Sequence, residues 1–96
     1  MFEILVIYEA VSKDARDLFV GEMKSSGVLE AIKNENGCVK YEYHFSLESD
    51  TAILLYEIWE SIEHQKAHMA TEHMKTAMQI KQKYISSVAI KGLGQL

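Results

Sequence analysis

Apolar residues fall into short runs whose period separates predicted strands from predicted helices. Residues 2–8 are mostly apolar and rich in β-branched side chains, which favours a buried strand. From residue 39, apolar and polar side chains alternate, as they do in a strand with one solvated face. After a turn at 48–50, residues 51–59 predict a third strand that is apolar on both faces, and residues 87–91 predict a short last strand. The apolar face of the second strand comprises Val39, Tyr41, Tyr43, Phe45 and Leu47.

Helical periodicity marks the segment between the first two strands. Ser12 offers an N-cap oxygen to a helix that Ser25-Ser26-Gly27 interrupts. Residues 28–32 predict one or two further helical turns before the turn at Asn36-Gly37. The apolar stripe of the first helix comprises Ala15, Leu18, Phe19 and Met23.

A second helical segment follows the third strand. Ser61 is expected to cap a short helix that ends at Met69, and Thr71 is expected to cap a longer helix that ends near Tyr84. One side of this longer helix comprises Met74, Ala77, Met78, Lys81 and Ile85.

The order strand, helix, strand, strand, helix, strand predicts an α+β fold of the ferredoxin-like βαββαβ plan. Such a fold has a four-stranded antiparallel sheet with its helices on one face. The first and third strands are apolar on both sides, so the second face of the sheet needs a cover. A second copy of the chain, related by a two-fold axis, would supply it. The alternative is that the first strand is strongly apolar and has one face that is partly exposed to solvent.

Length and charge restrict the class of protein. The chain has 96 residues, which predicts a single domain over residues 1–96. Its 10 basic and 14 acidic residues give a net charge of −4, and the basic residues are scattered, which disfavours nucleic acid as a partner. The chain has no apolar run of about 20 residues and no basic N-terminal region, so we expect neither a membrane span nor a secretory signal and predict a cytoplasmic protein. The one cysteine, Cys38, cannot form an internal disulfide bond.

Three runs of residues carry a family resemblance. They are Gly37–Glu42, Leu55–Trp59 and His73–Lys75, with His68 before the last. Together with the first strand they resemble the antibiotic-biosynthesis monooxygenase family, and within it the cofactor-free oxygenases and quorum-signal-processing members. The resemblance implies a dimeric α/β barrel, a small-molecule substrate and no cofactor. Family members often have proline where this chain has Glu72.

His68 and His73 are the candidate catalytic residues. An imidazole titrates near neutral pH and is suited to take a phenolic or enolic proton, the step that makes a substrate reactive toward oxygen without a cofactor. Each histidine also has a structural interpretation. His68 could be a half-buried residue with a satisfied hydrogen bond, and His73 could be a solvent-exposed residue in the first turn of its helix.

Aromatic residues and one acid are the candidate substrate-binding residues: Trp59, Tyr41, Tyr43 and Glu57. The Trp59 indole could stack on an aromatic or quinonoid ring, or it could close the end of the barrel. Tyr41 and Tyr43 share a strand face, so they could line a substrate pocket or contribute to the dimer core.

We predict no bound metal and no haem. His64 and His68 stand four residues apart, a spacing that can bind zinc, but no third ligand follows the pattern of a catalytic zinc site. Haem-degrading relatives have an asparagine on the first strand, which this chain lacks.

Three functions remain open on the sequence alone. The leading hypothesis is a homodimeric, cofactor-independent monooxygenase that acts on a quinol or another electron-rich small molecule. The others are an isomerase of a small phosphorylated signal molecule, which would use the histidines to move protons, and a non-catalytic dimer that binds a small ligand.

Overall fold

The strands and helices follow the predicted order, with each helical segment divided in two. The structure, a computed structural model, describes residues 1–95. Its elements are β1 (Phe2–Ala10), α1 (Lys13–Ser25), α2 (Val28–Lys33), β2 (Cys38–Phe45), β3 (Ala52–Trp59), α3 (Ile62–Met69), α4 (Glu72–Tyr84) and β4 (Ile85–Gln95).

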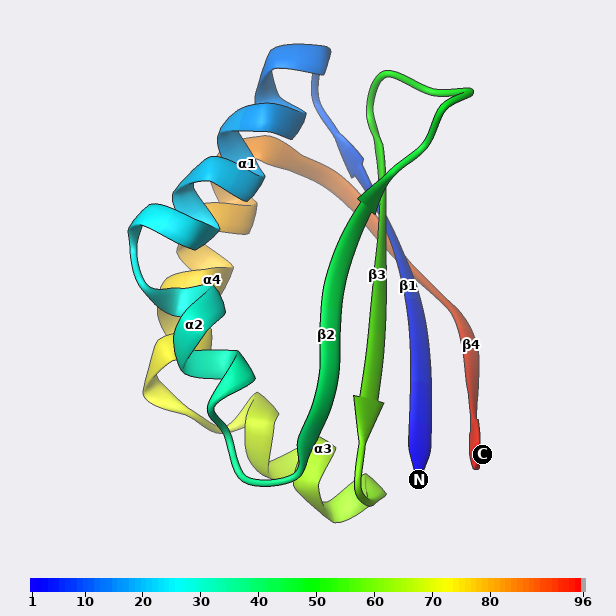
Figure 1. Ribbon diagram of the computed structural model, residues 1–96. Helices are drawn as coiled ribbons and strands as arrows, with labels where there is room; N and C mark the ends of the chain where they lie inside the picture. The colour runs from blue at the N-terminus through cyan, green and yellow to red at the C-terminus, as the bar shows by residue number, and fades with distance from the viewer. Residues whose placement is uncertain (96) are drawn as a thin grey trace.

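The four strands form one antiparallel sheet in the order β2-β3-β1-β4. This is the strand order of the ferredoxin-like fold, so the predicted fold class is confirmed. Helices α1, α2 and α4 lie over one face of the sheet, α3 lies at the end of the sheet where β3 ends, and within residues 1–95 the other face is bare, as Figure 1 shows. The bare face is the surface that the sequence assigns to a second copy of the chain.

The core lies between the helices and the inner face of the sheet. Along β1, buried residues alternate with half-buried ones, as the period of a strand requires. β3 repeats the pattern, and one acid occupies an inner position among its apolar residues. The inner residues of the two strands are Phe2, Ile4, Val6, Tyr8, Ala10, Ile53, Leu55, Glu57 and Trp59.

Two of the three predicted helix caps are confirmed. The Ser12 hydroxyl accepts from Ala15 N at 3.0 Å, and the Ser61 hydroxyl accepts from His64 N at 3.2 Å. Thr71 occupies the N-cap position of α4 but makes no capping hydrogen bond. Its hydroxyl instead donates to the carbonyl of His68 at 2.9 Å, which ties the end of α3 to the start of α4.

Some predicted positions were wrong. Leu18 and Met78 are 55% and 57% exposed, because other residues of α1 and α4 face the core. The buried residues of these helices are Ala15, Phe19 and Met23 in α1, and Met74, Ala77 and Ile80 in α4. Leu47 lies beyond the end of β2 and is fully exposed. The last strand runs from Ile85 to Gln95, longer than predicted, because it pairs with β1 along its whole length.

A tight turn at Gly37 connects α2 to β2. Gly37 has φ +83°, a conformation that favours glycine, and a Cβ at this position would clash with the His64 ring. The amide of Glu60 donates to the carbonyl of Gly37 at 2.8 Å, and the amide of Cys38 donates to the carbonyl of Glu35 at 3.1 Å. These contacts hold Glu35 next to the end of β3 and the start of α3.

Candidate functional site

A cavity of about 150 Å³ lies between the sheet and helices α3 and α4. Its size suits a single ring, since a cavity of about 150 Å³ can admit benzene. Its apolar wall includes Ile4, Val6, Tyr8, Tyr41 and Met74. Besides the two tyrosines, three titratable side chains line it: Glu57 from the sheet, His68 from α3 and Lys81 from α4. An apolar pocket with a few convergent polar groups is the usual form of a small-molecule site.

His68 is the most buried titratable residue in the cavity wall, with 2% of its surface exposed. Its ring lies against the Trp59 indole, with ring centroids 4.7 Å apart, and against Tyr41 at 5.7 Å. Its Nδ1 lies 2.8 Å from Oε2 of Glu35. Because a carboxylate can only accept, this contact assigns the proton to Nδ1 and leaves the lone pair of a neutral ring on Nε2. Among the described residues, Glu35 is the one hydrogen-bond partner of the His68 ring, and it contacts Nδ1.

The same Glu35 oxygen also binds the second candidate histidine. Nε2 of His73 lies 2.6 Å from Oε2 of Glu35. The side chain of Glu35 is 11% exposed and that of His73 is 25% exposed, so the three groups lead from the buried His68 toward solvent. Glu35 was not predicted from the sequence.

Glu35, His68 and His73 are also a possible metal-ligand set. Their ligand atoms all lie within 4.8 Å of one another. Two imidazoles with one carboxylate form the donor set of non-haem iron sites. This set differs from the His64 and His68 pair that the sequence suggested, because the Nδ1 of His64 lies 2.7 Å from the Ser61 hydroxyl. The contacts of 2.6 and 2.8 Å within the cluster are those of hydrogen bonds that share one oxygen.

Glu57 is a buried acid with a single side-chain donor among the described residues. It is 6% exposed, and the Nε1–H of Trp59 donates to its Oε1 at 2.9 Å. Burial raises the pKa of the Glu57 carboxyl, and the hydrogen bond from Trp59 and the positive charge of Lys81 oppose this rise. The carboxyl group is therefore easier to protonate than an exposed glutamate and can exchange a proton with a bound molecule.

The three candidate aromatic residues have different positions relative to the cavity. Tyr41 lines the cavity, and burial raises its pKa well above that of a free phenol. Tyr43 is half-buried and packs edge-on against Tyr41 at 5.8 Å, outside the cavity wall. Trp59 has no exposed surface and lies behind His68 and Glu57. In this arrangement Trp59 positions two groups that line the cavity, and its predicted stacking on a substrate stays a prediction.

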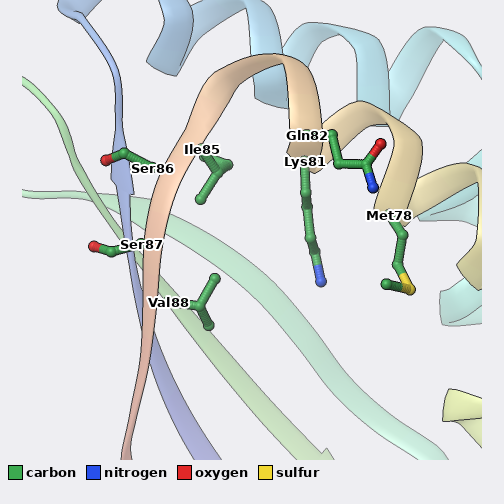
Figure 2. Close-up of a pocket in the computed structure, with 7 residues that line it drawn as sticks. All are labelled: Met78, Lys81, Gln82, Ile85, Ser86, Ser87 and Val88. Atoms are coloured by element: carbon green, nitrogen blue, oxygen red, sulfur yellow. The ribbon is translucent and has the colours of Figure 1, made fainter.

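A second hollow of about 280 Å³ lies between α4 and β4. Figure 2 shows its lining residues, with the Lys81 side chain extending away from α4 and Val88 on β4. Lys81 and Val88 line both this hollow and the cavity. Lys81 was predicted only as part of a helix face, so its position between the two spaces was not foreseen.

The comparisons with known proteins agree with this architecture. Residues 2–80 match the family described as antibiotic biosynthesis monooxygenase. A search of the curated proteins found no match. No helix within residues 1–95 is long and apolar enough to cross a membrane.

Several solved structures are similar to this one. A protein from Pseudomonas aeruginosa has a TM-score of 0.81 at 20% identity, with 99% of this chain and 93% of that chain covered. A candidate antibiotic biosynthesis monooxygenase from Deinococcus radiodurans has a TM-score of 0.79 at 19% identity, covering 100% and 92% of the two chains. Another such candidate, from Caulobacter crescentus, has a TM-score of 0.81 at 20% identity, covering 94% and 85%. At these identities the likeness establishes the fold.

Proposed function

The chain belongs to the antibiotic biosynthesis monooxygenase family, and from this premise we propose that it is a cofactor-independent monooxygenase acting on a quinol or another electron-rich small molecule. The main support for the proposal is the burial, position and hydrogen bonding of His68. The ring is buried, lines a cavity of single-ring size, and is held by Glu35 through one nitrogen. A histidine held in this way is a general base with a fixed tautomer.

In the proposed reaction, His68 Nε2 takes a proton from a substrate hydroxyl group. Glu35 accepts from Nδ1–H, keeps the ring in position and stabilises the imidazolium ion that forms. The resulting anion is electron-rich enough to transfer an electron to O₂. For a hydroquinone, one oxygen atom enters the new carbon–oxygen bond and the other leaves as water, so the products are a hydroxyquinone and one water. The substrate supplies the electrons.

The other candidate residues support the substrate in this scheme. The Tyr41 ring forms part of the cavity wall, and Glu57 faces the cavity as an acid that can donate a hydrogen bond when protonated. His73 shares the Glu35 oxygen and is partly exposed, so it can return the proton to solvent. Tyr43 and Trp59 support the lining residues from behind.

We also propose that the protein is a cytoplasmic homodimer whose subunits pack through the bare face of the sheet. The outward residues of β1 and β3 on this face are largely apolar, and they are half-buried by their neighbours within one chain. They include Leu5, Ile7, Leu54, Tyr56 and Ile58. Sedimentation at micromolar concentration should give twice the chain mass of 11.0 kDa, and a species of 11.0 kDa alone would contradict the dimer.

Oxygen consumption tests the proposed reaction. The purified protein is mixed with a panel of hydroquinones in an oxygen-electrode cell, and the products are identified by mass spectrometry. We expect uptake of one O₂ per hydroxyquinone formed, with one atom of ¹⁸O from labelled O₂ in the product. Failure of every hydroquinone to consume oxygen above the protein-free rate would contradict the oxygenase and leave the isomerase and the ligand-binding dimer.

A further inference from the structure

Lys81 provides a positive charge at the boundary between the two hollow spaces. It is half-buried, and its Nζ lies 5.2 Å from the centroid of the Tyr8 ring. An ammonium group over an aromatic face is weakly stabilised, and the ring offers it no hydrogen bond. The side chain extends away from α4 beside the hollow, as Figure 2 shows.

The neighbouring lysines of α4 have partners, and Lys81 differs from them. Lys75 lies 3.0 Å from a carboxylate oxygen of Glu72, and Lys83 lies 2.6 Å from one of Glu22. Among residues 1–95, no such ion pair includes Lys81. The acid that acts on it is Glu57, across the cavity and beyond ion-pair distance.

Removing an ammonium group from water is costly unless an anion compensates for the lost hydration. This cost is reflected in the pKa of Lys81, which burial lowers and which the charge of Glu57 restores only in part. An anion bound next to Lys81 would supply the missing compensation. Because the pKa of the buried Glu57 is raised, this carboxyl is easier to protonate than an exposed glutamate, so its protonation can accommodate a second anion in the cavity.

We infer that Lys81 is an anion-binding position of the cavity, and that the ligand is a small ring compound with a carboxylate or phosphate group. The ring lies against Tyr8 and Tyr41, within reach of His68, and the anionic group contacts Lys81 at the junction with the second hollow. This inference rests on the proposed site and names the class of its substrate. The oxygenase proposal alone does not require a charged substrate.

Binding of three matched compounds tests the inference without requiring turnover. Benzoate, its neutral analogue benzamide, and phenyl phosphate are titrated into the purified protein, with calorimetry as the readout and the fluorescence of Trp59, the only tryptophan, as a second signal. Benzoate should bind roughly 10- to 100-fold more tightly than benzamide, the usual effect of a hydrogen bond to a charged group. Comparison of benzoate with phenyl phosphate shows which anionic group the site prefers.

Variants of α4 and β3 provide the controls. Lys81→Met should remove the preference for benzoate, Lys81→Arg should keep most of it, and Glu57→Gln should increase the affinity for benzoate. Lys75→Met removes the same charge from an exposed position of the same helix and should change nothing. Equal binding of benzoate and benzamide, an equal loss in Lys75→Met, or no measurable binding of all three compounds would overturn the inference. A protein that binds benzoate through Lys81 but consumes no oxygen would instead contradict the oxygenase alone.

Discussion

Replacement of Glu35 by alanine should destabilise the protein mainly through His68. The Glu35 carboxylate accepts hydrogen bonds from two imidazole groups, at 2.8 Å from His68 and 2.6 Å from His73. His68 is only 2% exposed, so removal of the Glu35 carboxylate leaves its Nδ1–H without a partner inside the protein. Such an orphaned donor costs about 1–3 kcal/mol. His73 is 25% exposed and can bond to water instead, so it adds about 0–1 kcal/mol.

The total loss in the free energy of unfolding should therefore be about 1–4 kcal/mol, with most of it at His68. For a domain of this size, each kcal/mol corresponds to a fall of about 4–8 °C in the melting temperature. Urea unfolding of Glu35→Ala, His68→Ala, His73→Ala and the two double variants gives both coupling energies from double-mutant cycles. All samples need the same protein concentration, since dimerisation would change the apparent stability.

The coupling of Glu35 to His68 should exceed its coupling to His73. A loss of under about 0.5 kcal/mol in Glu35→Ala, typical of an exposed surface change, would refute the argument. A larger coupling to His73 than to His68 would refute the assignment of the cost to burial.

Three further predictions follow from other parts of the structure. Burial raises the pKa of Glu57, so the ionised carboxylate destabilises the folded state, and the stability that the protonated group contributes at acid pH is lost as pH rises through its folded pKa. In urea unfolding, Glu57→Gln should therefore gain stability over the original chain at pH 7 and much less at pH 4. An equal gain at both pH values would contradict the raised pKa. Gly37→Ala should lower the melting temperature, because the residue has φ +83° and its new methyl group would clash with the His64 ring. In Gly21→Ala the new methyl group meets nothing within 4 Å, so this variant should not have a lower melting temperature. Equal melting temperatures of the two variants would refute the argument. Elemental analysis of the purified protein should find less than one zinc or iron per chain, and its absorption spectrum should show no Soret band, since Glu35 already joins both histidines by hydrogen bonds. A stoichiometric metal that is lost in His73→Ala would show instead that Glu35, His68 and His73 form a metal centre.

The fold could be predicted because local rules fix most of it. Alternation along β1 and the caps at Ser12 and Ser61 depend only on neighbouring residues. Thr71 shows the limit, because its hydroxyl has two possible partners and the one it takes, the His68 carbonyl, depends on how α3 ends. The length of β4 likewise depends on pairing with β1, which no local pattern reveals.

The candidate site could be predicted only in part. His68 and Glu57 were found because histidines and acids near aromatic residues are chemically suggestive, and both line the cavity. Glu35 was missed because it stands 33 residues before His68, and only the turn at Gly37 brings it there. Lys81 was missed because helical periodicity assigns a side of the helix and says nothing about whether a partner lies opposite it.

The most direct test of the central claim is turnover by His68→Ala, measured as oxygen uptake with the hydroquinone that the original protein oxidises fastest. A positioned base contributes about 10²- to 10⁴-fold, so turnover should fall by that factor while circular dichroism and sedimentation show an intact fold and unchanged assembly. His44→Ala is the matched control, because His44 is exposed on β2 and lies outside the cavity wall. His44 lies beside Leu5 and Leu54 on the proposed dimer face, so sedimentation of this variant must also show unchanged assembly. With its assembly intact, the variant should keep full activity. Full turnover by a folded His68→Ala variant, or a loss no greater than its unfolded fraction explains, would contradict the assignment of His68 as the base.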